Sequence, residues 1–139
     1  MGKVNLSRVI MGGLLAGLII NVSEFLLNDK VMKTVWEAQL KTLGKTMPED
    51  AGAMTFWIVD GFVTGIVAVW LYAAIRPRYG PGPGTAARAG LVVWFFTCLL
   101  WALAMQNLGL FPVSVLALVW VLVESIVATI AGAWLYKEA

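Results

Sequence analysis

Residues 112–136 read PVSVLALVWVLVESIVATIAGAWLY and carry a single charged side chain, Glu124. The hydrocarbon core of a bilayer is about 30 Å thick, and about 20 mostly apolar residues in an α-helix are needed to cross it. Unpaired backbone groups are costly in hydrocarbon, so such a segment must be helical. This stretch therefore predicts a transmembrane helix, and it sets the class of the whole chain.

Three further stretches have the same character, which predicts a protein with four spans. The predicted spans are approximately residues 8–27, 51–75, 88–106 and 112–136. The chain is 60% hydrophobic and 13% charged, whereas soluble domains have about 45–50% apolar and about 25% charged residues. We expect an all-α integral membrane four-helix bundle, a single domain over residues 1–139. The lipid bilayer is its expected partner.

The segment between the first two spans predicts one more helix, over about residues 29–43. Apolar side chains recur there at helical spacing, which is typical of an amphipathic helix. Asn28 is a candidate N-cap and Gly44 a candidate end. We expect this helix to lie flat at the membrane surface; the alternative is a lid over the end of the bundle. Residues 76–84, where Pro and Gly alternate, predict a loop.

Several classes of function are disfavoured by the composition. The chain has no histidine and one cysteine, Cys98. It therefore offers neither the commonest general base near neutral pH nor a cysteine metal cluster. We expect no metal, no cofactor and no enzymatic activity. A net charge of +2 spread along the chain gives no basic patch for nucleic acid.

Residues 48–72 and 112–136 align without gaps and share eight identities in 25 positions. The identities include the first residue, a proline, and the final Trp-Leu-Tyr. This pattern predicts two helical hairpins of the same orientation, a parallel repeat about an axis along the membrane normal. The first and third spans share little beyond Arg8 and Arg88, and chance similarity between apolar helices is the alternative.

Small residues indicate where helices pack closely. Gly13 and Gly17 in the first span form a Gly-x-x-x-Gly motif, and Gly61 and Gly65 form another in the second. This spacing places two small residues on one helix face, so that two backbones can approach. Packing within one chain is the first interpretation, and dimerisation is the second.

Aromatic and basic residues near the span ends predict the orientation. Trp70, Tyr72, Trp134 and Tyr136 are candidate anchors at one membrane interface. Six basic residues crowd the span ends on that side, whereas the four on the other side are mixed with acids. The six are Lys3, Arg8, Arg76, Arg78, Arg88 and Lys137; the four are Lys30, Lys33, Lys41 and Lys45. Both termini are therefore predicted to be cytoplasmic.

Three acids lie within the predicted spans: Glu24, Asp60 and Glu124. Asp60 and Glu124 occupy matching positions of the repeat, about 18 Å along each helix from its proline, near the membrane midplane. No basic residue is available at that depth, so we expect these carboxyls to be protonated or hydrogen-bonded and to face the bundle interior. One interpretation is a proton or ion site shared by Asp60 and Glu124, with Glu24 at its outer mouth. The other is that the acids only fix the helix packing.

Three strings resemble a family of small bacterial four-helix integral membrane proteins to which no activity is assigned. They are GGLLAGLIINVSEF at 12–25, YAAIRPRYGPGPG at 72–84 and GAWLYKE at 132–138. The resemblance covers the whole chain and implies a bacterial inner membrane, but no activity.

These observations favour a non-enzymatic multi-pass inner-membrane protein, with a homo-oligomer as an open possibility. One alternative is a small proton- or cation-coupled transporter or channel that uses the intramembrane acids. Another is an accessory subunit of a larger membrane complex. A water-filled cavity at the acids would favour transport, whereas a dry, hydrogen-bonded core would favour packing.

Overall fold

The structure is a computed structural model that describes residues 4–48 and 50–138, and every regular element in these residues is helical. The elements are α1 (Leu6–Phe25), η1 (Leu26–Val31, a π-helix), α2 (Lys33–Thr42), α3 (Ala51–Tyr79), α4 (Pro83–Trp94), η2 (Phe95–Leu99, a π-helix), α5 (Leu100–Asn107) and α6 (Val115–Trp134). Four continuous stretches, Leu6–Val31, Ala51–Tyr79, Pro83–Asn107 and Val115–Trp134, are long and apolar enough to cross a membrane. The prediction of an all-α chain with four helices of spanning length is confirmed.

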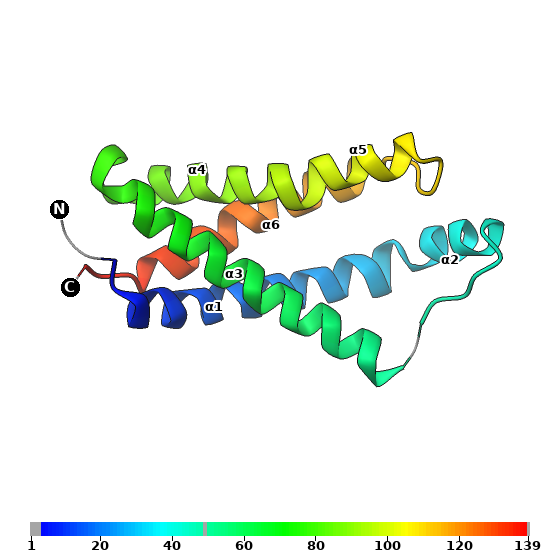
Figure 1. The fold of residues 1–139 in the computed structure, drawn as a ribbon, viewed down its shortest axis with the longest axis horizontal. Coiled ribbons are helices and arrows are strands. Elements are labelled where there is room, and N and C mark those ends of the chain that lie inside the picture. Colours follow the sequence, from blue (N-terminus) through cyan, green and yellow to red (C-terminus); the bar gives the residue numbers. More distant parts are fainter. Residues whose placement is uncertain (1–3, 49, 139) are drawn as a thin grey trace.

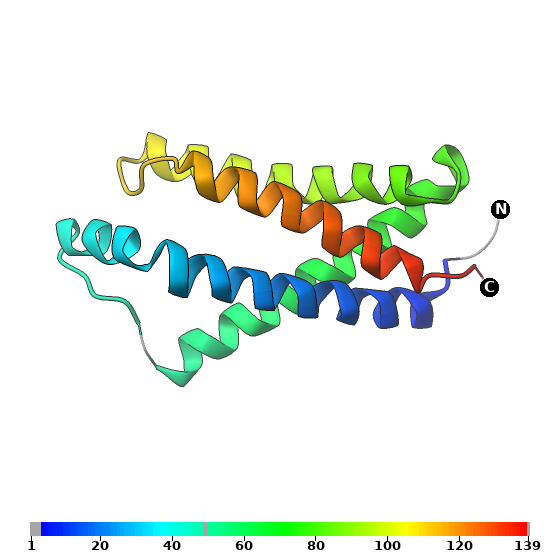
Figure 2. The ribbon, with the colours of Figure 1, turned by 180° about the vertical axis from the view of Figure 1, so that it is seen from behind.

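The chain ends lie at the same end of the molecule as the α3–α4 connection (Figure 1). α2 lies at the opposite end, beside the α5–α6 turn (Figure 2). We call residues 5–20, 65–90 and 125–138 the terminal half, and residues 21–64 and 91–124 the distal half. α3 crosses α1, and its first turns stand apart from the other helices in the distal half (Figure 1).

Three of the helices begin at residues whose side chains cap the free backbone N–H groups. Asn5 accepts a hydrogen bond from the Arg8 N–H, Asp50 from Ala53 and Ser114 from Ala117. Such caps satisfy donors that have no partner inside the helix. Asp50 is therefore the cap of α3 rather than a residue of its first turn, and Glu49 lies outside the described residues.

The first helix is longer than predicted, because α1 passes directly into η1 and ends at Val31. Asn28 is therefore not an N-cap. It lies inside the helix, where its side-chain amide donates to the backbone carbonyl of Glu24, four residues earlier, at 2.9 Å. The following helix α2 ends near Gly44, whose φ of +68° favours glycine.

The prediction that residues 76–84 form a loop is wrong for most of that segment. α3 continues through Pro77 to Tyr79, and α4 already begins at Pro83, so only residues 80–82 connect them. Proline suits the first helical position, where the missing N–H has no partner to lose. Gly80 and Gly82 have φ values of +82° and +127°, which permit the sharp reversal.

The third and fourth helices also differ from their predicted bounds. The third stretch begins at Pro83 rather than near 88. The fourth begins at Val115 and ends at Trp134 rather than covering 112–136. Pro112 lies in the turn before α6, where the Gln106 side chain accepts a hydrogen bond from the Val113 N–H at 2.9 Å.

α2 packs over the α5–α6 turn. The Gln39 side-chain amide donates to the carbonyl of Leu110 at 2.7 Å, and the Trp36 ring meets the Phe111 ring edge-on with centroids 6.0 Å apart. No residue of α2 is buried. These contacts correspond to the lid alternative for the amphipathic helix rather than to a helix that lies apart on a surface.

The apolar core lies mainly in the terminal half. It is built largely from small side chains, with two tyrosines at its end: Val9, Ala16, Ile20, Val69, Tyr72, Ala73, Ala86, Ala89, Ala128, Ala133 and Tyr136. The Tyr72 and Tyr136 rings pack edge to face, with centroids 5.9 Å apart. Small side chains allow the helix backbones to come close, which is the usual way that helices associate in a membrane.

The four glycines of the Gly-x-x-x-Gly motifs lie together where α1 crosses α3. A methyl group in place of the Gly65 hydrogen would lie 2.3 Å from the Gly17 backbone nitrogen and 2.6 Å from the Gly13 carbonyl oxygen. A methyl group on Gly61 would meet the Asn21 side chain at 2.7 Å. Only glycine permits this contact between the two backbones.

Candidate functional site

A line of hydrogen bonds links α2 to the first helix in the distal half. The indole N–H of Trp36 donates to Asn28 Oδ1 at 2.9 Å. The Asn28 amide nitrogen in turn donates to a carboxylate oxygen of Glu24. Asn28 therefore holds the Glu24 carboxyl group, and Trp36 holds Asn28.

Glu124 lies opposite, on α6, and is 6% exposed. Its carboxyl is a hydrogen-bond neighbour of Glu24 and of Ser23. The other face of the Ser23 hydroxyl accepts from the Trp120 indole N–H at 2.9 Å. Ionised carboxylates are acceptors only, so Glu24 and Glu124 can bond to each other only when one of them carries a proton. The pair is thus a place where a proton can be held between two helices.

The position of Asp60 differs from the one expected. Its side chain is exposed on the part of α3 that stands apart from the bundle, and it does not face the interior. It is close enough to repel Glu24 electrostatically, but Glu124 pairs with Glu24 instead. The reason is tertiary: α3 crosses α1 at an angle, so its distal turns diverge from α6 although the two sequences align.

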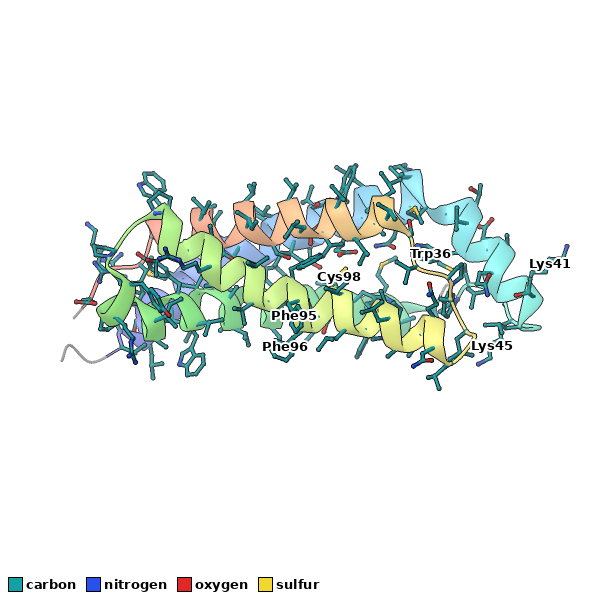
Figure 3. The ribbon with its side chains drawn as sticks, turned by 90° about the horizontal axis from the view of Figure 1, so that it is seen from above. Trp36, Lys41, Lys45, Phe95, Phe96 and Cys98 are labelled. Atoms are coloured by element: carbon teal, nitrogen blue, oxygen red, sulfur yellow. The ribbon has the colours of Figure 1, made fainter. Side chains whose placement is uncertain are left out.

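A cavity of about 130 Å³ adjoins Glu24. Its walls come from η1, α2, the η2–α5 stretch and α6, and most of them are aromatic or aliphatic. The residues that line it include Glu24, Asn28, Trp36, Cys98, Trp101 and Phe111. In Figure 3, Cys98 lies between α6 and the helix that carries η2. This volume has room for about four water molecules, since each occupies about 30 Å³ of the liquid.

A second, more open hollow adjoins Glu124 on the outer surface of the helices. It has a volume of about 470 Å³ and lies between α1 and α6. Its lining is apolar apart from two groups, and the residues are Ile19, Ser23, Leu116, Val119, Trp120, Val123, Glu124 and Val127. The carboxyl pair therefore lies between a cavity on the Glu24 side and a groove on the Glu124 side.

Salt bridges in the described residues lie away from this pair. Asp29 pairs with Lys30 at 2.7 Å and with Lys33 at 3.8 Å, on the surface near α2. Arg76 pairs with Glu138 at 2.8 Å, in the terminal half. Over residues 4–48 and 50–138, no salt bridge reaches Glu24, Asp60 or Glu124, and no cluster of His, Cys, Asp and Glu could hold a metal ion. A proton is the positive charge that the chain itself can place between the carboxyls.

The four aromatic residues proposed as interface anchors divide into two kinds. Trp70 and Trp134 are exposed, Trp134 at 81%. Tyr72 and Tyr136 are buried, so the expectation that they are surface anchors is wrong. A step of two residues turns an α-helix by about 200°, which carries each tyrosine to the face opposite its tryptophan. The Arg76 guanidinium lies 5.7 Å from the centre of the Tyr136 ring.

Sequence reasoning missed several residues that build the site, namely Ser23, Asn28, Trp36, Trp101 and the role of Cys98 as a cavity wall. Two signals were present. Asn28 follows Glu24 by four residues, which places both side chains on one helix face. Trp36 lies on the apolar side of the predicted amphipathic helix, so it had to face something apolar.

The two π-helical segments lie beside the site. η1 begins two residues after Glu24, and η2 contains Cys98. A π-turn adds one residue to the helical repeat and turns the following side chains to new directions, and such turns are frequent at functional sites.

Comparison of the chain with protein-family models, with curated proteins and with solved structures finds no match. The class is defined by the fold and the site alone: a helical protein with four helices of spanning length and a carboxyl pair between two of them.

Proposed function

We propose that this chain is a non-enzymatic multi-pass protein of a bacterial inner membrane, with both termini in the cytoplasm, and that it is a small proton-coupled transporter. Its Glu24–Glu124 pair would bind and release the coupling proton. The single observation that carries this proposal is the pair itself: two carboxyls from different helices that touch, with an internal cavity on one side and a groove on the other.

The cost of the pair argues for function over packing. An acid in the middle of a span costs about 2.5–3.5 kcal/mol on insertion scales, and such acids usually mark ion or proton pathways. Two ionised carboxylates side by side repel each other, so the pair exchanges one proton rather than two at ordinary pH. A pair that served packing alone would need no cavity, whereas Glu24 lines one.

We also propose that the two hairpins, α1 with α3 and α4–α5 with α6, are copies of one ancestral unit. One support is that the caps Asp50 and Ser114 are 64 residues apart, the offset of the sequence repeat. Two such units would give a transporter two bodies that rock against each other, as in other proteins built from repeats.

A close-packed glycine in each hairpin supports the same proposal. A methyl group on Gly17 would lie 2.7 Å from the Phe62 Cα, and one on Gly90 would lie 2.9 Å from the Ile126 Cα. Phe62 and Ile126 are again 64 residues apart. Gly17 and Gly90 are 73 apart, so this geometry would not equate Arg8 with Arg88, which are 80 apart.

Proton flux into proteoliposomes tests the transport proposal. With a pH-sensitive dye inside and an imposed potential, the wild type should acidify the lumen, and Glu24→Gln and Glu124→Gln should each abolish the flux. Asp60→Asn is the matched control, because it also removes an acid from a span but lies outside the pair. Flux in the glutamine variants equal to that of the wild type would end the proposal.

A second candidate function is that of an accessory subunit. It is favoured by the first turns of α3, where Phe56, Trp57 and Asp60 are all exposed on a helix that stands apart from its neighbours. A carboxyl that faces lipid is costly, so a partner that covers this surface would stabilise it. Co-purification after gentle extraction, lost in Asp60→Leu, tests this alternative.

A further inference from the structure

The aromatic cavity has the features of a cation site. Trp36 and Phe111 stand nearly perpendicular, at 77°, and form two adjoining walls. Trp101 contributes to the lining, and Glu24 supplies the carboxyl group. The face of an aromatic ring attracts a cation, most strongly where water is excluded, and several rings around one carboxyl bind organic ammonium groups in many proteins.

We propose that this cavity binds a small organic monocation of the ammonium type, and that the cation displaces the proton from the Glu24–Glu124 pair. The inference rests on the proposed function and names the substrate class of the same site. When the cation enters, the Glu24 O–H bond breaks and the proton leaves to water, so the charge of the site is unchanged. One cation bound therefore corresponds to one proton released.

The size of the cavity limits the ligand. A volume of about 130 Å³ holds about four waters, which corresponds to roughly four to six heavy atoms. Tetramethylammonium has five heavy atoms and fits this range. Larger dye-like cations would require the cavity to open, and α2 is the element that closes it at the end of the molecule.

The chemistry of the lining disfavours inorganic cations. Hard cations such as Ca²⁺ and Mg²⁺ need six or more oxygen ligands. The cavity offers few oxygens, and two of them are already engaged: Asn28 Oδ1 accepts from Trp36, and the Ser114 hydroxyl accepts from the Ala117 N–H. An organic cation needs no such shell, because its methyl groups can contact ring faces directly.

The other titratable groups near the pair are Asp60 on α3 and Cys98 on η2, which both interact electrostatically with Glu24. The Asp60 carboxylate is exposed and would add to the attraction for a cation without contacting it. The Cys98 thiol lines the cavity wall. Neither group can replace Glu24 in direct contact, so the exchange of cation and proton depends on Glu24.

Equilibrium dialysis of radiolabelled tetramethylammonium against the full chain in lipid nanodiscs tests the inference. The wild type should bind it, more weakly at low pH, and should release about one proton per cation into a weak buffer. Glu24→Gln should abolish binding. Trp36→Leu should weaken it about tenfold or more, and Trp36→Phe, which keeps a ring, should weaken it less. Trp134→Leu, an exposed tryptophan at the other end, should bind as the wild type does.

Neutral tert-butanol, also of five heavy atoms, should not compete with tetramethylammonium. If it competes equally, or if Trp36→Leu and Trp134→Leu bind alike, the cation site is overturned. Absence of binding while the wild type still conducts protons would overturn this inference and leave the proposed function standing. Binding without any proton flux would overturn the proposed function and leave a cation-binding protein.

Discussion

The terminal and distal halves of the molecule are built on different principles. In the terminal half, glycines and alanines bring three helices into backbone contact around Val69 and Ala128, which are fully buried. In the distal half few side chains are fully buried: the first turns of α3 stand apart, two helices contain π-turns, and the space between them holds acids and a cavity. The comparison teaches that one half holds the bundle together, and the other is free to carry polar chemistry.

This division is physically reasonable. A carboxyl pair, a cavity and a π-turn each reduce the packing that stabilises helices in a membrane, where the interior offers no hydrophobic driving force between helices. Their cost must be offset by close packing elsewhere. The glycine contacts lie toward the terminal end, away from the cavity, so changes at the site leave them intact.

The largest expected effect tests the packed half. Gly65→Leu would force a side chain into the backbone of α1, because even a methyl group would lie 2.3 Å from the Gly17 nitrogen. We expect a loss of about 3 kcal/mol or more in the free energy of unfolding, measured by denaturant titration in detergent. Gly84→Ala is the control, since nothing lies within 4 Å of its added methyl. Equal stability of the two variants would contradict the account of the packed half.

A middle-sized effect concerns the cap on the distal half. Gln39→Leu removes the hydrogen bond from α2 to the Leu110 carbonyl and should cost about 1 kcal/mol. Because few other contacts hold α2, we expect faster amide hydrogen exchange in Lys33–Thr42 and unchanged exchange in α6. Glu37→Gln, on an exposed side of the same helix, is the control. Unchanged exchange in α2 would mean that its position depends on other contacts.

The smallest effect is expected at Asp60. Its carboxyl is exposed and forms no salt bridge in the structure, so Asp60→Asn should change the unfolding free energy by less than about 0.5 kcal/mol. Thermal unfolding in detergent measures this. A large loss of stability would show that Asp60 has a partner in the folded protein, either within the chain or in an oligomer, and would favour the accessory-subunit alternative.

Much of the fold could be predicted from local properties of the sequence. Residues such as those of 115–134 are apolar over a length that only a membrane accommodates, so the helices follow from hydropathy and from the need to pair every backbone group. The loop over 76–84 could not be predicted correctly. Pro83 reads as a helix breaker in isolation, but it is also a favourable first residue, and the sequence alone does not distinguish these roles.

The sequence by itself determined that the chain is helical, that four helices have spanning length, and that three acids lie within them. Only the tertiary structure decided which acids meet. Asp60 and Glu124 hold matching positions in two aligned segments, yet Glu24 is the neighbour of Glu124 and Asp60 faces outward. The physical reason is that depth along a helix is a property of the sequence, whereas direction around the bundle depends on how α3 crosses α1.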